Sequence, residues 1–215
     1  NKNKKKLQPL LTKNTHIVSQ DLSSSLGAQQ LYEQTIAHFG FPDVLINNAG
    51  IAISSSVNTD ADFWNSSWNK TLNVNLASPA YLCKCFINIK RNKNIHSRFR
   101  IINISSRAAF RGETEDYISY ACSKGGMVSL TKTIARSFGK KDNVLAFTIA
   151  PGFVKTEMIK DFLNKEGEDY VKKGIVLDRL TEPKDISPIV SLIVSGKLDH
   201  ATGSTIDING GSYLR

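Results

Sequence analysis

The 215-residue sequence has few cysteines, no metal-ligand pattern and no long apolar run. Three cysteines are too few for the disulfide framework on which small secreted domains depend. The four histidines are scattered, so we expect no metal site. No apolar run approaches the roughly 18 residues of a membrane span, and the apolar run after the lysine-rich start is too short for a signal peptide. We therefore expect a cytoplasmic protein with no membrane contact.

The net charge of +9 raises the question of nucleic-acid binding. Four of the lysines lie within the first six residues, and no basic stripe interleaved with aromatic residues follows them. A solvated surface explains the charge better, so we expect no nucleic-acid partner. With 40% apolar and 22% charged residues, the composition is that of an ordinary globular protein, and the length predicts one domain over residues 1–215.

Short apolar runs alternate with longer stretches of helical periodicity along the chain. This alternation is typical of a parallel sheet that helices cover on both faces. We predict strands at residues 16–19, 44–46, 100–104, 144–149 and 205–208. We predict helices at residues 22–39, 68–89, 116–138 and from 182 onward, with an interrupted helical region over 156–180. The predicted fold is α/β, with a Rossmann-like doubly wound parallel sheet.

Small and polar residues follow several of the predicted strands, at the sheet edge where open α/β folds bind ligands. They are the runs Asn47-Asn48-Ala49-Gly50, Ser105-Ser106 and Pro151-Gly152. In the helix after the serines, Tyr120 and Lys124 are four residues apart and share one helix face. A nearby ammonium favours the ionised phenol, and such a tyrosine can exchange a proton with a substrate oxygen. From this spacing alone, a surface pair is the alternative.

The motifs occur in a characteristic order: Asn47 to Gly50, then Trp68 with Asn75 seven residues later, Ser106, Tyr120 with Lys124, and the run from Pro151 to Thr156. From about residue 21 to the C-terminus, the sequence resembles the short-chain dehydrogenase/reductase family, and most resembles its 3-oxoacyl-[acyl-carrier-protein] reductases. The resemblance implies an NAD(P)(H)-dependent oxidoreductase that interconverts a small-molecule carbonyl and alcohol, with 3-oxoacyl thioesters as candidate substrates.

The resemblance slightly favours NADP over NAD, but the sequence does not distinguish the two cofactors. It also implies a homo-oligomer, a dimer or a tetramer, built through the helices around residues 72–86 and 121–138.

The resemblance also implies roles for matching residues in catalysis. Tyr120 corresponds to the acid/base, and Lys124 to the lysine that holds the nicotinamide ribose and lowers the pKa of the tyrosine. Ser106 corresponds to the serine that holds the substrate oxygen, with Ser105 as its rival. Asn75 corresponds to the asparagine that holds a water in the proton relay, and a helix-packing amide is the alternative.

The cofactor residues implied by the resemblance are drawn from the strand ends. They are Asp21, Asn47, Ala49, Gly50, Tyr120, Lys124, Pro151, Gly152 and Thr156. Asp21 could equally cap a helix, and the run from Asn47 to Gly50 could be a plain turn that ends a strand.

The sequence departs from the family at its start. Family members begin with a strand and a glycine-rich turn that receives the cofactor pyrophosphate, whereas the first glycine here is Gly27, within a predicted helix. No initiator methionine is present, and we expect roughly the first 35–40 residues of the family pattern, its first β-α-β segment, to be absent.

That absence would leave strand 16–19 without a neighbour and strand 44–46 as an exposed edge. We therefore predict that this chain binds the cofactor poorly and tends to aggregate. The alternative function is a non-catalytic family member that acts as a structural or sensing subunit.

Overall fold

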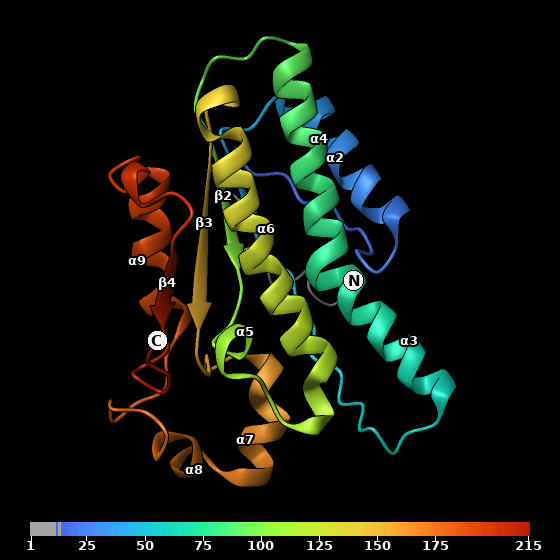
Figure 1. The fold of residues 1–215 in the computed structure, drawn as a ribbon, viewed down its shortest axis with the longest axis vertical. Coiled ribbons are helices and arrows are strands. Elements are labelled where there is room, and N and C mark those ends of the chain that lie inside the picture. The colour runs from blue at the N-terminus through green and yellow to red at the C-terminus, as the bar shows by residue number, and fades with distance from the viewer. Residues whose placement is uncertain (1–11, 13) are drawn as a thin grey trace.

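The computed structural model describes residues 12 and 14–215, and its centre is a four-stranded parallel sheet (Figure 1). The strands β1 (Val44–Asn47), β2 (Phe99–Ile104), β3 (Val144–Pro151) and β4 (Thr205–Ile208) lie side by side in chain order. Every neighbouring pair is parallel. The predicted α/β class and parallel sheet are confirmed. The lysine-rich start of the chain lies outside the described residues.

Helices connect the strands. They are α2 (Ser25–Phe39), α3 (Ala61–Leu72), the π-helix η2 (Asn73–Ala77), α4 (Ser78–Asn92), α5 (Ala108–Arg111), α6 (Ile118–Asp142), α7 (Lys160–Glu166), α8 (Glu168–Lys172) and α9 (Pro183–Val194). Short 3-10 turns lie at η3 (Glu115–Tyr117), η4 (Glu157–Ile159) and η5 (Asp199–Ala201). Within the described part of the chain, none of these helices is long and apolar enough to cross a membrane.

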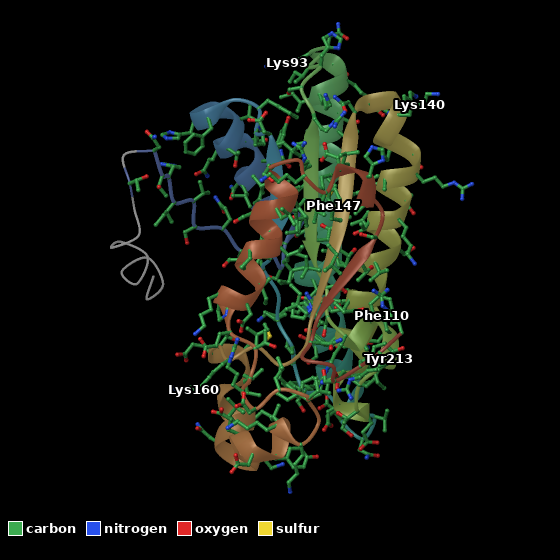
Figure 2. All side chains as sticks on the ribbon, turned by 90° about the vertical axis from the view of Figure 1, so that its left-hand side faces the viewer. Lys93, Phe110, Lys140, Phe147, Lys160 and Tyr213 are labelled. Carbon is green, nitrogen blue, oxygen red and sulfur yellow. The ribbon has the colours of Figure 1, made fainter. Side chains whose placement is uncertain are left out.

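The two faces of the sheet have separate apolar cores. Successive strand residues point to opposite faces, so Ile101 packs with α2, α4 and α6, while Ile102 packs with α9. Phe147 of β3 belongs to the α9 side and is fully buried, near the middle of the molecule in Figure 2. The helices therefore cover both faces, as a doubly wound sheet requires.

The structure corrects three of the predicted boundaries. Residues 16–19 form no strand, because no neighbouring strand in the described chain offers them hydrogen bonds. The helix predicted over residues 68–89 begins earlier, at Ala61, and is interrupted by η2. The helix predicted to end before Gly139 continues to Asp142, because Asn143 adopts the left-handed conformation (φ 53°) that ends it.

Strand β1 is one edge of the sheet, and Ile46 on it is 44% exposed. The exposed apolar edge therefore agrees with the prediction from the sequence. Figure 1 shows β2 and β3 pointing toward the end of the molecule where α5, α7 and α8 lie. The carboxyl ends of these strands, where ligands bind in open sheets, therefore face the end of the molecule that carries these short helices (Figure 1).

Candidate active site

Helix α6 carries Tyr120 and Lys124 on one face, as their spacing predicts. The Lys124 side chain is 4% exposed, and its Nζ donates a hydrogen bond of 2.9 Å to the carbonyl oxygen of Ile104, at the end of β2. The same Nζ lies 5.7 Å from the centre of the Tyr120 ring. The lysine is therefore held between the strand end and the tyrosine.

Burial lowers the pKa of Lys124 to about 8. Burial also raises the pKa of Tyr120, an effect that hydrogen bonding with Ser106 opposes; Glu113 adds to the rise, and the charge of Arg107 opposes it. The resemblance implies a tyrosine whose pKa is lowered by Lys124, and the direction found here is the reverse. Burial disfavours the phenolate more than the Ser106 hydroxyl and the Arg107 charge favour it.

The two serines after β2 make different contacts. Ser105 is buried, and its hydroxyl donates a 2.8 Å hydrogen bond to the carbonyl oxygen of Lys124, which ties the strand end to α6. Ser106 accepts a 3.1 Å hydrogen bond from the Ala108 amide and lies beside the Tyr120 phenol. The structure therefore brings Ser106 and Tyr120 together, while the Ser105 hydroxyl is committed to holding the backbone.

Asn75 lies inside the π-helix η2, a kind of helix that is frequent at functional sites. Its Oδ1 accepts a 2.8 Å hydrogen bond from the Ile51 amide, and its Nδ2 donates to the Ile51 carbonyl at 2.9 Å and to the Ser123 hydroxyl at 3.0 Å. The side chain is 1% exposed. It clamps the loop after β1 to α6 and so sets the position of Gly50.

The space around Gly50 indicates whether the site can accommodate the nicotinamide end of a cofactor. A Cβ at Gly50 would lie 3.4 Å from Lys124 Nζ and 3.5 Å from Asn75 Oδ1, so the missing side chain leaves room beside a buried ammonium. Such a donor suits ribose hydroxyls. The residues present therefore fit the nicotinamide-ribose half of the cofactor.

The described residues do not supply a matching cradle for the phosphates. Their first glycine, Gly27, lies within α2, where a Cβ would sit 1.9 Å from the Asp21 carbonyl oxygen. This glycine therefore serves the close approach of the preceding loop to the helix, and nothing about its surroundings forms a glycine-rich turn. Poor cofactor binding by this chain stays a prediction.

Asn47 is directed into the protein interior. Its Nδ2 donates a 2.8 Å hydrogen bond to Asn103 Oδ1, and Asn103 Nδ2 in turn donates to the Thr131 hydroxyl at 2.8 Å. Both asparagine side chains are buried. This buried amide network joins β1, β2 and α6, so the Asn47 side chain stabilises the sheet and is not directed toward a ligand.

Two other residues that the resemblance implies for cofactor binding, Asp21 and Ala49, lie on the surface. Asp21 is exposed, and its carboxylate accepts hydrogen bonds of 2.9 Å from the amide and the hydroxyl of Ser23, which lower its pKa. Ser24, rather than Asp21, caps α2 by accepting from the Gly27 amide. Ala49 is exposed after β1. The structure does not bring Asp21 or Ala49 into contact with Tyr120.

The turn after β3 lies against the C-terminal segment. The Gly152 amide donates a 3.0 Å hydrogen bond to the Ile208 carbonyl, and a Cβ at this glycine would lie 3.0 Å from Asn209 backbone atoms. Pro151 is buried, and Thr156 is exposed at the start of η4. Gly152 is therefore required for the close approach of two strand ends, while Thr156 remains open to solvent.

Arg107 is a site residue that sequence reasoning missed. It directly follows Ser106, is only 7% exposed, and stacks its guanidinium 4.6 Å from the centre of the Phe153 ring. Its charge acts on the Tyr120 phenol. A basic residue directly after a strand end, before the apolar stretch Ala108-Ala109-Phe110, is the signal that could have identified it.

The lowered pKa of Lys124 predicts a dependence of stability on pH. In the unfolded chain the lysine has its ordinary pKa of 10.5, against about 8 in the folded protein. Between these values the unfolded chain binds more protons, so the free energy of unfolding gains from this group as the pH rises from about 8 to about 10. We expect wild type to gain stability relative to Lys124→Met over that range in denaturant titrations. A stability difference that does not change between pH 7 and 10 would contradict the burial of this charge.

Comparison with known proteins identifies the class to which this fold and site belong. A family model described as Enoyl-(Acyl carrier protein) reductase matches residues 1–213. A 3-oxoacyl-[acyl-carrier-protein] reductase of Buchnera aphidicola is 34% identical over 177 residues, which cover 82% of this chain and 69% of the relative. The chain belongs to the short-chain dehydrogenase/reductase family, and the predicted class, an NAD(P)-dependent oxidoreductase, is confirmed. Within the family, it resembles the 3-oxoacyl-[acyl-carrier-protein] reductases.

Solved structures agree with this assignment. The structure of a 4-hydroxyisoleucine dehydrogenase complexed with NADH and succinate matches with a TM-score of 0.82 and 29% identity, over 99% of this chain and 85% of that one. A blue fluorescent protein from a metagenomic library, in complex with NADPH, matches with a TM-score of 0.77 and 25% identity, over 91% of this chain and 74% of that one. Both cofactors therefore occur among proteins that share this fold.

Proposed function

We propose that the chain catalyses the interconversion of a carbonyl and an alcohol at the site formed by Ser106, Tyr120, Lys124 and Asn75. The proposal rests on one observation: the Tyr120 phenol lies next to the Ser106 hydroxyl, and both are near the buried Lys124 ammonium. A bound nicotinamide would supply or accept the hydride. The protein's own residues would bind the substrate oxygen and move its proton.

In this proposal, Tyr120 donates its phenolic proton to the substrate oxygen during reduction and takes it back during oxidation. Ser106 donates a hydrogen bond to the same oxygen, which stabilises the negative charge that develops there. Lys124 places its positive charge 5.7 Å from the centre of the Tyr120 ring. This charge limits the free-energy cost of forming the phenolate. Asn75 holds the loop that carries Gly50 beside this lysine.

The substrate class has two candidates. Similarity to the Buchnera 3-oxoacyl-[acyl-carrier-protein] reductase supports 3-oxoacyl thioesters. Similarity to the 4-hydroxyisoleucine dehydrogenase, which is complexed with NADH and succinate, supports a small acid that carries a hydroxyl or a ketone. The solved structures in complex with NADH and with NADPH leave the cofactor as NADP or NAD.

A pair of serine variants tests this assignment of the site. Ser106→Ala is expected to lower kcat by about 100-fold, because it removes a donor to the developing oxyanion, with little change in stability. Ser105→Ala is expected to keep its activity per folded molecule but to lose about 1 kcal/mol of stability, because its buried hydrogen bond to Lys124 is lost. Activity and chemical denaturation are measured on both variants. The reverse pattern would make Ser105 the substrate-binding serine.

We further propose a cytoplasmic homo-oligomer, a dimer or a tetramer, built through α4 and α6. Sedimentation of the purified protein tests this proposal, and a monomer at micromolar concentration would contradict it. A non-catalytic subunit is the competing function for the same fold. Turnover of any carbonyl substrate that depends on Tyr120 would exclude it.

A further inference from the structure

Arg107 is a nearly buried residue whose guanidinium forms no ion pair with the described residues. The residue is 7% exposed, and in the part of the chain that the structure describes no carboxylate pairs with it and no acceptor takes a hydrogen bond from its guanidinium. The charge of the nearest acidic neighbour in sequence, Glu113, acts on Arg107. Glu113 nevertheless makes its hydrogen bonds of 3.0 and 3.1 Å with Arg111. An arginine stays charged at neutral pH, and a buried unpaired charge destabilises a protein by several kcal/mol.

The stacking of Arg107 on Phe153 does not replace an anion. The guanidinium carbon lies 4.6 Å from the ring centre, a contact that offsets part of the desolvation cost but leaves the five N–H donors of the group free at their edge. The backbone is held as well, because the Arg107 amide donates a 3.0 Å hydrogen bond to the Pro151 carbonyl. The guanidinium of Arg107, called the fork below, is therefore held in place while its N–H donors have no acceptor in the described part of the protein.

The position of this fork is next to the reacting groups. Arg107 follows Ser106 in the chain, and its charge acts on the Tyr120 phenol. Phe153, beneath the guanidinium, stacks on Phe162 of α7 at 5.3 Å, so the fork lies between the serine and the helical region after β3. A substrate whose oxygen is bound by Ser106 and Tyr120 would bring its neighbouring atoms to Arg107.

We infer that Arg107 binds the carboxylate of the substrate, and that the substrate is therefore a small oxo or hydroxy acid rather than a 3-oxoacyl thioester. This inference rests on the proposed function. A planar carboxylate accepts two parallel hydrogen bonds from a guanidinium and supplies the missing counter-charge. A thioester is uncharged next to its reacting carbonyl, and it would leave the arginine unpaired. The acid and the carbonyl group would share one short carbon chain.

The test compares acids with their own neutral esters. Pyruvate, acetoacetate and levulinate, each with its methyl ester, and acetoacetyl-CoA are assayed with saturating NADH and NADPH. We expect at least one acid to exceed its ester by about 100-fold in kcat/KM. Arg107→Gln is expected to raise KM for that acid about 100-fold and to abolish the preference, and Arg107→Lys to restore part of it.

Two controls separate substrate binding from a structural role. Arg111→Gln removes a neighbouring arginine that is already paired with Glu113, and it should leave the ratio between acid and ester unchanged. Succinate should raise the unfolding temperature of wild type but not of Arg107→Gln, a readout that needs no turnover. Arg107→Gln itself should not lower the unfolding temperature, since it removes an unpaired buried charge.

The outcomes distinguish this inference from the proposed function. Preference for an ester or for acetoacetyl-CoA, or an unchanged ratio in Arg107→Gln, would overturn the carboxylate site and leave the oxidoreductase intact. Failure to reduce any of the seven carbonyl compounds, with no stabilisation by succinate, would overturn both.

Discussion

Replacing Tyr120 by phenylalanine is expected to lower kcat by about a thousand-fold, because the substrate oxygen loses the group that exchanges its proton. The change removes one hydroxyl and keeps the aromatic ring beside Lys124. Cofactor affinity should change little, since Lys124 stays bound to the Ile104 carbonyl. Steady-state kinetics and fluorescence titration with NADPH and NADH measure the two effects separately.

Tyr117 offers a matched control for this prediction. It lies three residues earlier, in the 3-10 turn η3 before α6, and is half-buried. Tyr117→Phe removes the same atom and should leave kcat within a factor of two or so, as neutral surface changes do. Equal losses in both variants would point to a general disturbance of the start of α6 and would contradict the role of Tyr120.

Replacing Asn103 by leucine is expected to lower the free energy of unfolding by about 2–4 kcal/mol. The substitution keeps the branched shape of the side chain, but it leaves the Cys83 sulfur as the acceptor for Asn47 Nδ2 and removes a donor from the Thr131 hydroxyl, all within the core. Removing one partner of a buried hydrogen bond costs about 1–3 kcal/mol, and two such bonds are lost here. Urea denaturation measures the change.

The control for this variant is Asn69→Leu on the exposed surface of α3, which should change stability by less than about 0.5 kcal/mol. Cofactor affinity per folded molecule should be the same in Asn103→Leu as in wild type. A variant that keeps full stability but loses cofactor binding would show that the buried amide network serves the ligand rather than the sheet.

Much of this fold could be predicted from the sequence, because its signals are local. The strands at 44–47, 99–104, 144–151 and 205–208 coincide with apolar runs, and α2 ends at residue 39 as predicted. Glu182 and Pro183 begin α9, where Glu182 and Asp185 form a capping box. The strand predicted at residues 16–19 does not form, because a strand needs a neighbouring strand to pair with. The sequence of four residues does not show whether such a neighbour exists.

The candidate site was predictable in its residue types but not in its interactions. The spacing of Tyr120 and Lys124 predicts that they share a face, yet the burial that raises one pKa and lowers the other depends on the whole fold. Asn47 illustrates the limit, because an asparagine at a strand end can turn toward a ligand or into the core. Arg107 was missed because its lack of a partner is a property of three-dimensional surroundings.

The central claim is that this site transfers a hydride to a carbonyl carbon while Tyr120 supplies the proton. The most direct measurement uses NADH and NADPH that carry deuterium at the transferring position, with the preferred carbonyl substrate, and locates the label by mass spectrometry and NMR. Deuterium bonded to the carbinol carbon of the product in wild type, and about a thousand-fold less in Tyr120→Phe over the same time, is the predicted result. Oxidation of the nicotinamide without label in the alcohol, or equal labelling by the two proteins, would contradict it.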